Sequence, residues 1–206
     1  ENAVVMYNFK ELELLAESDI EYPKSEPYKL CTFSRVMKEK GIEDAINAVE
    51  SVNAHFGRTV YTLDIFGQVD AEYKERFSQL KKSFPDYIRY GGAIEANKSV
   101  ETLKSYFALL FPTYYKGEGF AGTLIDAMSA GVPVIASDWK YNPEFVVPGK
   151  TGVIIKNCNA ERLAEELINI AAAPEKWNSM RLSALKESEK YKPDIAARPL
   201  IDRING

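Results

Sequence analysis

Cysteine and histidine are scarce in this sequence of 206 residues, which has two cysteines, Cys31 and Cys158, and one histidine, His55. The cysteines form no Cys-x-x-Cys pair, so no disulfide framework is indicated and a reducing compartment is favoured. A single histidine near the end of an expected helix is far more often structural than catalytic.

Long apolar runs and an excess of positive charge are also missing. No stretch of about 18 apolar residues is present, which excludes a predicted membrane-spanning helix. The net charge of -4 offers no global basic field for a nucleic acid. The first residues, "ENAVVMYNF", have neither a basic region nor a long apolar core, so no signal peptide is predicted. Because Glu1 replaces an initiator Met, we expect a segment of a longer protein.

Apolar runs do alternate with amphipathic segments, and a hydrophobic content of 46% is enough for one buried core. The runs predict strands at 28–34, 59–67, 86–92, 108–112, 132–137 and 151–156. Helical spacing predicts helices at 41–56, 71–84, 99–107, about 122–130, 160–173 and 174–191, with Ser99 as an N-cap. Strands that are apolar throughout and alternate with helices predict an α/β fold, a Rossmann-like doubly wound parallel sheet. Ligands of such sheets bind beyond the carboxyl ends of the strands.

A glycine-rich turn, "GEGFAG" at 117–122, opens one of the expected helices. Glycines let a backbone approach a ligand closely, and the first N–H groups and the dipole of a helix favour an anion such as phosphate. The alternative is an ordinary connection between a strand and a helix.

Two cations follow the first strand in "SRVMKEKG", at Arg35 and Lys40. Their loop and the glycine turn can open on the same rim of a doubly wound sheet, where arginine grips phosphate bidentately and lysine acts as a point charge. The alternative is a solvated basic loop, and Lys38 fits that alternative better.

Two acids flank the glycine turn, Glu118 within it and Asp126 in the helix that follows. Carboxylates are natural acceptors for sugar hydroxyls, so beside a phosphate site they predict contacts to the sugars on either side of a diphosphate. The alternatives are a favourable charge at a helix start for Glu118 and a surface position for Asp126.

Together these features resemble a known enzyme family. The order R-x4-KG, then EGF-x-G-x-L-x-[acid]-A-M-x-x-G-x-P-V-I-A, then PE-x-V-x-x-G-x-TG is similar to that of retaining glycosyltransferase family four, whose GT-B architecture has two Rossmann-like domains. The similarity covers roughly residues 28–172 and matches the C-terminal, donor-binding half. It implies a linker from an N-terminal domain at 1–27, a nucleotide-sugar-binding domain at 28–190 and a C-terminal crossing segment at 191–206.

The resemblance also implies roles for individual residues. Arg35 and Lys40 match the pair that binds the nucleotide diphosphate and stabilises it as a leaving group. Glu118 matches the acid that contacts the transferred sugar, and Asp126 the acid that holds the ribose hydroxyls. The turn whose backbone amides meet the phosphate corresponds to Phe120, Ala121, Gly122 and Thr123. The loop beside the nucleobase corresponds to Gly91, Gly92, Ala93 and Ile94.

Three positions depart from the family pattern. Asp126 stands where a longer glutamate is usual, so ribose binding would need a shifted helix or a bridging water. Ala121 replaces a usual glycine, which tests whether that position needs a positive φ angle. Ser34 replaces a glycine that commonly precedes the arginine. None of these changes removes a charge.

The implied reaction transfers a sugar from a nucleotide sugar (UDP-, GDP- or ADP-linked) to an acceptor hydroxyl with retention, for polysaccharide or glycolipid synthesis. The family needs no metal or other cofactor, and the sequence has no Asp-x-Asp motif. The resemblance also implies a cytoplasmic enzyme, with peripheral association at the inner face of the membrane as a further expectation. Two alternatives remain: a sugar-nucleotide epimerase of the same architecture and a non-catalytic nucleotide-sugar-binding module.

Overall fold

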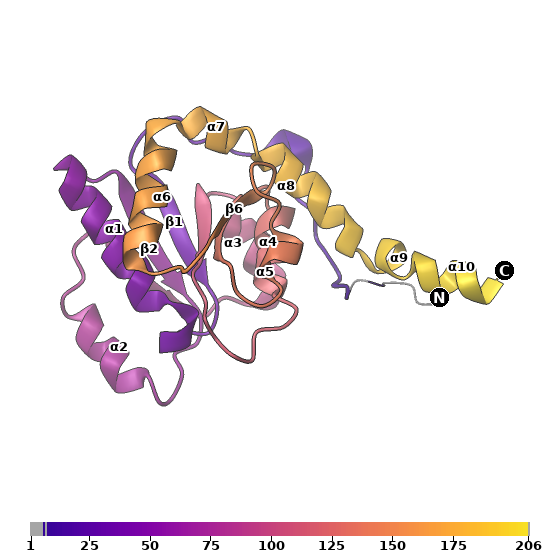
Figure 1. Ribbon diagram of the computed structural model, residues 1–206, viewed down its shortest axis with the longest axis horizontal. Coiled ribbons are helices and arrows are strands. Elements are labelled where there is room, and N and C mark those ends of the chain that lie inside the picture. Colours follow the sequence, from indigo (N-terminus) through magenta and orange to yellow (C-terminus); the bar gives the residue numbers. More distant parts are fainter. Residues whose placement is uncertain (1–5, 7, 206) are drawn as a thin grey trace.

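Six parallel strands form one sheet in the order β3-β2-β1-β4-β5-β6 in the computed structural model, which describes residues 6 and 8–205 (Figure 1). The strands are β1 (Tyr28–Phe33), β2 (Tyr61–Phe66), β3 (Ile88–Gly92), β4 (Ala108–Phe111), β5 (Val134–Ser137) and β6 (Gly152–Ile155). This order reverses direction between β1 and β4, as in a doubly wound Rossmann-like sheet. The predicted fold class is confirmed.

The helices connect these strands and cover both faces of the sheet (Figure 1). The α-helices are α1 (Ile42–Phe56), α2 (Lys74–Lys81), α3 (Ser99–Leu103), α4 (Gly122–Ser129), α5 (Asn142–Phe145), α6 (Ala160–Ala172), α7 (Pro174–Asn178), α8 (Arg181–Ser188), α9 (Pro193–Ala196) and α10 (Arg198–Asn205). Short 3-10 turns lie at Glu17–Asp19, Lys38–Lys40, Ala96–Lys98 and Glu189–Tyr191.

Two apolar cores lie on opposite faces of the sheet, because successive strand residues point to opposite sides. Leu30 belongs to the core beneath α1 and α6, and the next residue, Cys31, belongs to the core beneath α3, α4 and α8. Both side chains are fully buried. Burial on both faces explains why the strand sequences are apolar throughout rather than alternating.

Two helix predictions were wrong in detail. Ser99 is not an N-cap: it is the first residue of α3, and its hydroxyl donates to the Ala96 carbonyl inside the preceding turn. The helix expected at 174–191 is divided into α7, α8 and a 3-10 turn. The division lets Trp177 donate to the Phe107 carbonyl and Arg181 donate to the Tyr106 carbonyl at the start of β4.

The segment before β1 packs against the domain on the side of α4 and α8. The Leu15 N–H donates to the Ser129 carbonyl at 3.0 Å, and Asn178 donates to the Pro23 carbonyl at 2.7 Å. Ile20 is buried. The segment expected as a linker, 1–27, thus makes its described contacts with this domain, and residues 1–5 and 7 lie outside the described residues.

The last two helices extend away from the sheet (Figure 1). Leu200, Ile201 and Ile204 of α10 are 50%, 47% and 74% exposed, while Ala196 of α9 is buried. None of the described helices combines the length and apolar character needed to cross a bilayer.

Candidate functional site

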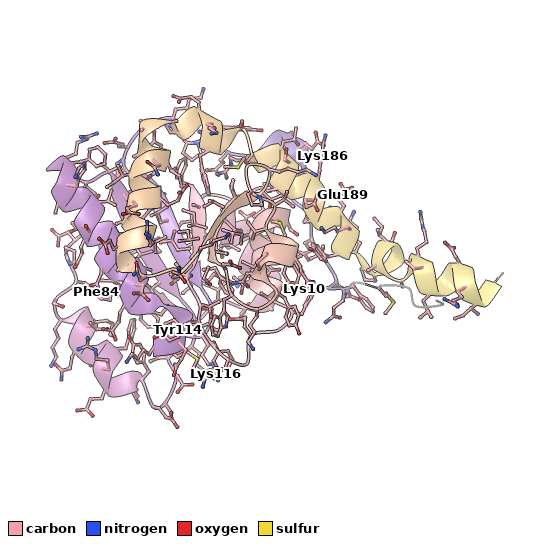
Figure 2. All side chains as sticks on the ribbon, in the orientation of Figure 1. Lys10, Phe84, Tyr114, Lys116, Lys186 and Glu189 are labelled. Carbon is pink, nitrogen blue, oxygen red and sulfur yellow. The ribbon has the colours of Figure 1, made fainter. Side chains whose placement is uncertain are left out.

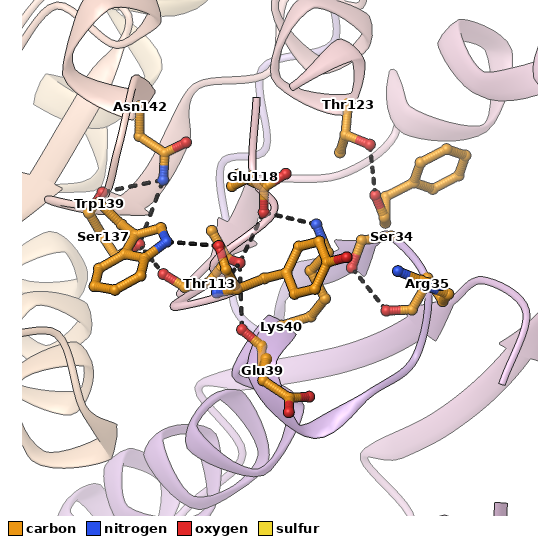
Figure 3. A network of polar contacts seen from close by, with 12 residues as sticks. Ser34, Arg35, Glu39, Lys40, Thr113, Glu118, Thr123, Ser137, Trp139 and Asn142 are labelled. Atoms are coloured by element: carbon orange, nitrogen blue, oxygen red, sulfur yellow. Dashed lines mark hydrogen bonds and ion pairs between the residues drawn. The ribbon is translucent and has the colours of Figure 1, made fainter. Parts of the chain in front are cut away.

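The candidate site lies where β1 and β4 end side by side at the switch point of the sheet. After β1 the chain continues through Arg35 and Lys40 into α1, and after β4 it continues through Glu118 into α4. The Thr123 hydroxyl donates to the Phe33 carbonyl at 2.8 Å, which ties the first turn of α4 to the end of β1 (Figure 3). The two loops that the sequence singled out therefore open on the same rim.

Lys40 and Glu118 form a nearly buried ion pair in this site. The Lys40 Nζ lies 2.6 Å from the Glu118 Oε2, and their side chains are 11% and 8% exposed. The Thr113 hydroxyl donates to the same oxygen at 2.8 Å (Figure 3). No described residue donates to the Glu118 Oε1, so this oxygen keeps its acceptor capacity for a ligand.

Arg35 and Lys40 share the ring of Tyr115. The Arg35 guanidinium carbon lies 5.7 Å from the ring centroid, and the Lys40 Nζ lies 5.3 Å from it. Arg35 is half-exposed, with one terminal nitrogen 3.5 Å from an Asp70 carboxylate oxygen. Two cations thus converge on one edge of the site, and the more exposed of them is free to turn toward an anion.

A hydrogen-bonded network behind Glu118 holds its loop in place. The Ser137 hydroxyl donates to the Thr113 carbonyl at 2.5 Å, and Asn142 donates to the Ser137 carbonyl at 3.1 Å. The Trp139 indole donates to the Tyr115 carbonyl at 2.7 Å (Figure 3). Sequence reasoning named the strand end at Ser137 but missed Thr113, Trp139 and Asn142, because their contacts join segments that are distant in sequence.

Gly41 sets the position of Lys40. Its φ of 70° lies in the left-handed region, and a Cβ placed there would lie 2.3 Å from the Pro112 carbonyl oxygen. Only glycine fits both demands. The close approach brings the loop after β1 against the loop after β4, which is how Lys40 reaches Glu118.

Replacing Gly41 by Ala is expected to lower the free energy of unfolding by about 2–5 kcal/mol, because left-handed backbone adds about 1–2 kcal/mol and overpacking adds about 1–3 kcal/mol. Gly57 at the other end of α1 is the matched control, since its φ is 64° and a Cβ there would meet nothing within 4 Å. Gly57→Ala should therefore cost only the backbone part, about 1 kcal/mol. Urea unfolding of both variants measures the difference, and equal losses would contradict the role of the Pro112 contact.

Asp126 is buried, and the alternative that placed it on the surface is wrong: its residue is 6% exposed. Its carboxylate accepts two contacts from the Lys10 Nζ, at 2.6 and 2.8 Å. Lys10 lies beside α4 (Figures 1 and 2). The sequence offered no signal for this partner.

The remaining predicted residues surround the start of α4 and the end of β3. Ala121 has a φ of -81°, so this position does not require a glycine, and Phe120 packs on Phe145 with ring centroids 5.6 Å apart. Gly92 has a φ of 80°, and a Cβ on Gly91 would lie 2.2 Å from the Phe66 ring. These two glycines are therefore demanded by the fold whatever the loop binds.

Two cavities adjoin the acids. One of about 430 Å³ lies between Asp126, residues 10–13 and the turn at 96–100. A second of about 200 Å³ lies beside Gly119 and Phe120. In the loop after β3, Ile94 packs on the core beneath the first cavity, and Ala93 is exposed.

His55 is exposed and lies in the last turn of α1. Among the described residues, no group of three or more His, Cys, Asp or Glu side chains is placed to hold a metal ion.

The chain matches the family model "Glycosyl transferases group 1" over residues 16–187. It is 34% identical over 137 residues to the UDP-N-acetylglucosamine–peptide N-acetylglucosaminyltransferase GtfA subunit of Streptococcus gordonii, covering 65% of this chain and 26% of that protein. It is 27% identical over 172 residues to the poly(glycerol-phosphate) alpha-glucosyltransferase of Bacillus subtilis, covering 81% and 24%.

Solved structures show the same fold. The structure of a GtfA/B complex superposes with a TM-score of 0.70 at 26% identity, covering 90% of this chain and 37% of that chain. The present chain thus spans about a quarter of the length of the curated relatives named above, with 26% and 24% covered.

Proposed function

We propose, since this chain belongs to the glycosyl transferases of group 1, that it is the C-terminal, donor-binding half of a retaining glycosyltransferase of family four. The observation that carries the proposal is the Lys40–Glu118 pair, which sits beside Arg35 at the start of α4. A cation for a diphosphate and an acid for a sugar thus stand next to each other at the carboxyl edge of the sheet.

Arg35 and Lys40 are proposed to bind the diphosphate and to neutralise the charge that grows on it as the sugar leaves. The amino end of α4, with Phe120, Ala121, Gly122 and Thr123, adds the favourable field of its first N–H groups. Such preorganised positive groups stabilise a departing anion, which is the work that a metal does in other enzymes. We therefore propose a mechanism without a metal or another cofactor.

The two acids are proposed to hold the sugars on either side of that diphosphate. Glu118 has its Oε1 available for a hydroxyl of the transferred sugar, next to the cation that binds the leaving group. Asp126 lines the larger cavity and is proposed to accept from the ribose hydroxyls. The loop of Gly91, Gly92, Ala93 and Ile94 is proposed to lie beside the nucleobase.

The rest of the enzyme is proposed to come from an N-terminal domain of the same protein. The relatives are about four times as long as the part matched here, with 26% and 24% covered. Residues 1–27 would lead from that domain, and 191–206 would return to it through the exposed apolar face of α10. Transfer would then take place between the domains, and this chain alone should show little or no turnover.

The acceptor is proposed to be a hydroxyl of a growing polysaccharide or glycolipid, at the cytoplasmic face of the membrane. Two relatives point to related acceptors: one is a glucosyltransferase of poly(glycerol phosphate), and one transfers N-acetylglucosamine to a peptide. Both names describe the transfer of a sugar to a polymer. The donor base and sugar are the first properties to measure.

Thermal unfolding with UDP, GDP, ADP and their sugars tests the donor proposal. A ligand at 100 times its Kd should stabilise the folded chain by about 2.7 kcal/mol, a rise in Tm of about 5–10 °C for a domain of this size. One of the three bases should give this shift at the lowest concentration. No shift with any nucleotide or nucleotide sugar would overturn the proposed function.

A further inference from the structure

Lys10 brings a cation from outside the α/β repeat to the acid of α4. Its Nζ lies 2.6 Å from one oxygen of the Asp126 carboxylate and 2.8 Å from the other. The Asp126 side chain is only 9% exposed, whereas that of Lys10 is 33% exposed. The ammonium is therefore the more accessible part of this pair for a ligand.

The backbone of the N-terminal segment holds this ammonium in place. The Lys10 N–H donates to the Tyr191 carbonyl at 3.1 Å, and Leu12 packs on the core beneath α4. Gly122 lies beside the side chain, since a Cβ there would lie 3.9 Å from the Lys10 Nζ, an ordinary contact distance. These anchors, at Lys10 itself and two residues later, fix Lys10 in the wall of the cavity.

The pair faces a cavity that can take a ligand. Lys10 and Asp126 line one side of the cavity of about 430 Å³, and Ala96, Asn97 and Ser99 line another. The cavity thus lies between the acid proposed for the ribose and the chain that follows the loop proposed for the base.

The two groups supply complementary hydrogen-bonding capacity. A carboxylate has about four acceptor sites and an ammonium has three donors. Their two mutual contacts leave Asp126 able to accept further hydrogen bonds and leave Lys10 with a proton to donate. Two neighbouring hydroxyls of a sugar both donate and accept, so the pair matches a vicinal diol, and Lys10 need not leave for the diol to bind.

We propose that Lys10 is a specificity-determining residue which, paired with Asp126, recognises the 2′- and 3′-hydroxyls of a ribonucleoside diphosphate. The inference rests on the proposed function and deepens it, because it assigns a donor contact to the segment that precedes the sheet. It also gives the shorter acid at position 126 a partner, because the lysine beside it supplies a donor to the same diol.

Lys10→Met tests the proposal because it keeps the length of the side chain and removes its charge and its donors. Calorimetry should measure the Kd of UDP, GDP and ADP, each beside its 2′-deoxy form. The unaltered chain should prefer the ribose form by about tenfold or more, the usual effect of losing a hydrogen bond to a charged group. Lys10→Met should lower that ratio by about threefold or more, and the preference that remains should come from Asp126. Lys150→Met is the matched control, since Lys150 pairs with Glu187 at the surface at 3.0 Å, and it should keep the full ratio.

The ratio separates recognition from a structural role. A lysine that only stabilised Asp126 would change the Kd of both forms equally and leave the ratio intact, which would overturn the proposal. Tighter binding of both forms by Lys10→Met would show that Lys10 blocks the site and would also overturn it. Lys10→Gln keeps a hydrogen bond for Asp126 and should lower the ratio in a folded chain if Lys10→Met unfolds. If the unaltered chain binds none of the nucleotides, the proposed function itself fails.

Discussion

Replacing Lys40 by Met is expected to weaken binding of the preferred nucleoside diphosphate by about 100-fold, the effect of losing a charge-assisted hydrogen bond. It should also lower the free energy of unfolding by about 3–5 kcal/mol, because Glu118 would remain buried without its cation. The side chains of the pair are 11% and 8% exposed, so water can replace the ammonium only in part. Calorimetry and urea unfolding measure the two effects separately.

Two further variants separate these effects of Lys40. Lys116→Met removes an exposed lysine from the neighbouring loop, and it should change both quantities little (Figure 2). The double variant Lys40→Met, Glu118→Gln removes both charges and should recover much of the stability but none of the binding. Recovery of nucleotide affinity in the double variant would show that Lys40 acts only by neutralising Glu118.

Replacing Glu118 by Gln is expected to reduce sugar transfer by about 100- to 1000-fold in the protein that carries this chain together with its proposed N-terminal domain. The plain nucleoside diphosphate should bind as well as before or more tightly, because the change removes a negative charge beside the anion site and releases Lys40. The nucleotide sugar should lose the contact to its transferred residue. Initial rates of transfer and calorimetry with both ligands measure these outcomes.

Glu165→Gln is the matched control for Glu118, since Glu165 is 55% exposed and pairs with Arg162 on the surface. It should leave both transfer and binding unchanged. Full transfer by Glu118→Gln, or an equal loss of affinity for nucleotide and nucleotide sugar, would show that Glu118 supports the loop rather than the sugar. Such a supporting role would act through the Thr113 hydroxyl, which donates to the Glu118 Oε2 that Lys40 also contacts.

The outline of the site could be predicted from the sequence because its parts follow local rules. A cation after the first strand, a glycine turn and a helix start must meet when parallel strands end at one edge. Lys40, Glu118 and Thr123 accordingly lie around the ends of β1 and β4. Ala121 is a second example: with a φ of -81° its backbone is open to any residue, which explains how the chain tolerates this departure from the family.

Details that depend on neighbouring segments could not be predicted in the same way. Ser99 looks like an N-cap by composition, yet its hydroxyl bonds to a 3-10 turn that local spacing does not reveal. The helix expected at 174–191 divides because Trp177 and Arg181 each donate to a carbonyl near β4. A buried donor needs an acceptor, and these two hydrogen bonds form only if the helix is interrupted.

By itself the sequence determined the six-stranded α/β fold and the family, because strand and helix periods, turn glycines and motif order are properties of adjacent residues. Only the tertiary structure decided which charges meet. Lys10 and Asp126 are 116 positions apart, and Lys40 and Glu118 are 78 apart. No local pattern pairs residues so far apart in the sequence, because such pairs form only when whole helices and strands pack together. A carboxylate that loses its water on burial needs a partner, and this packing supplies one.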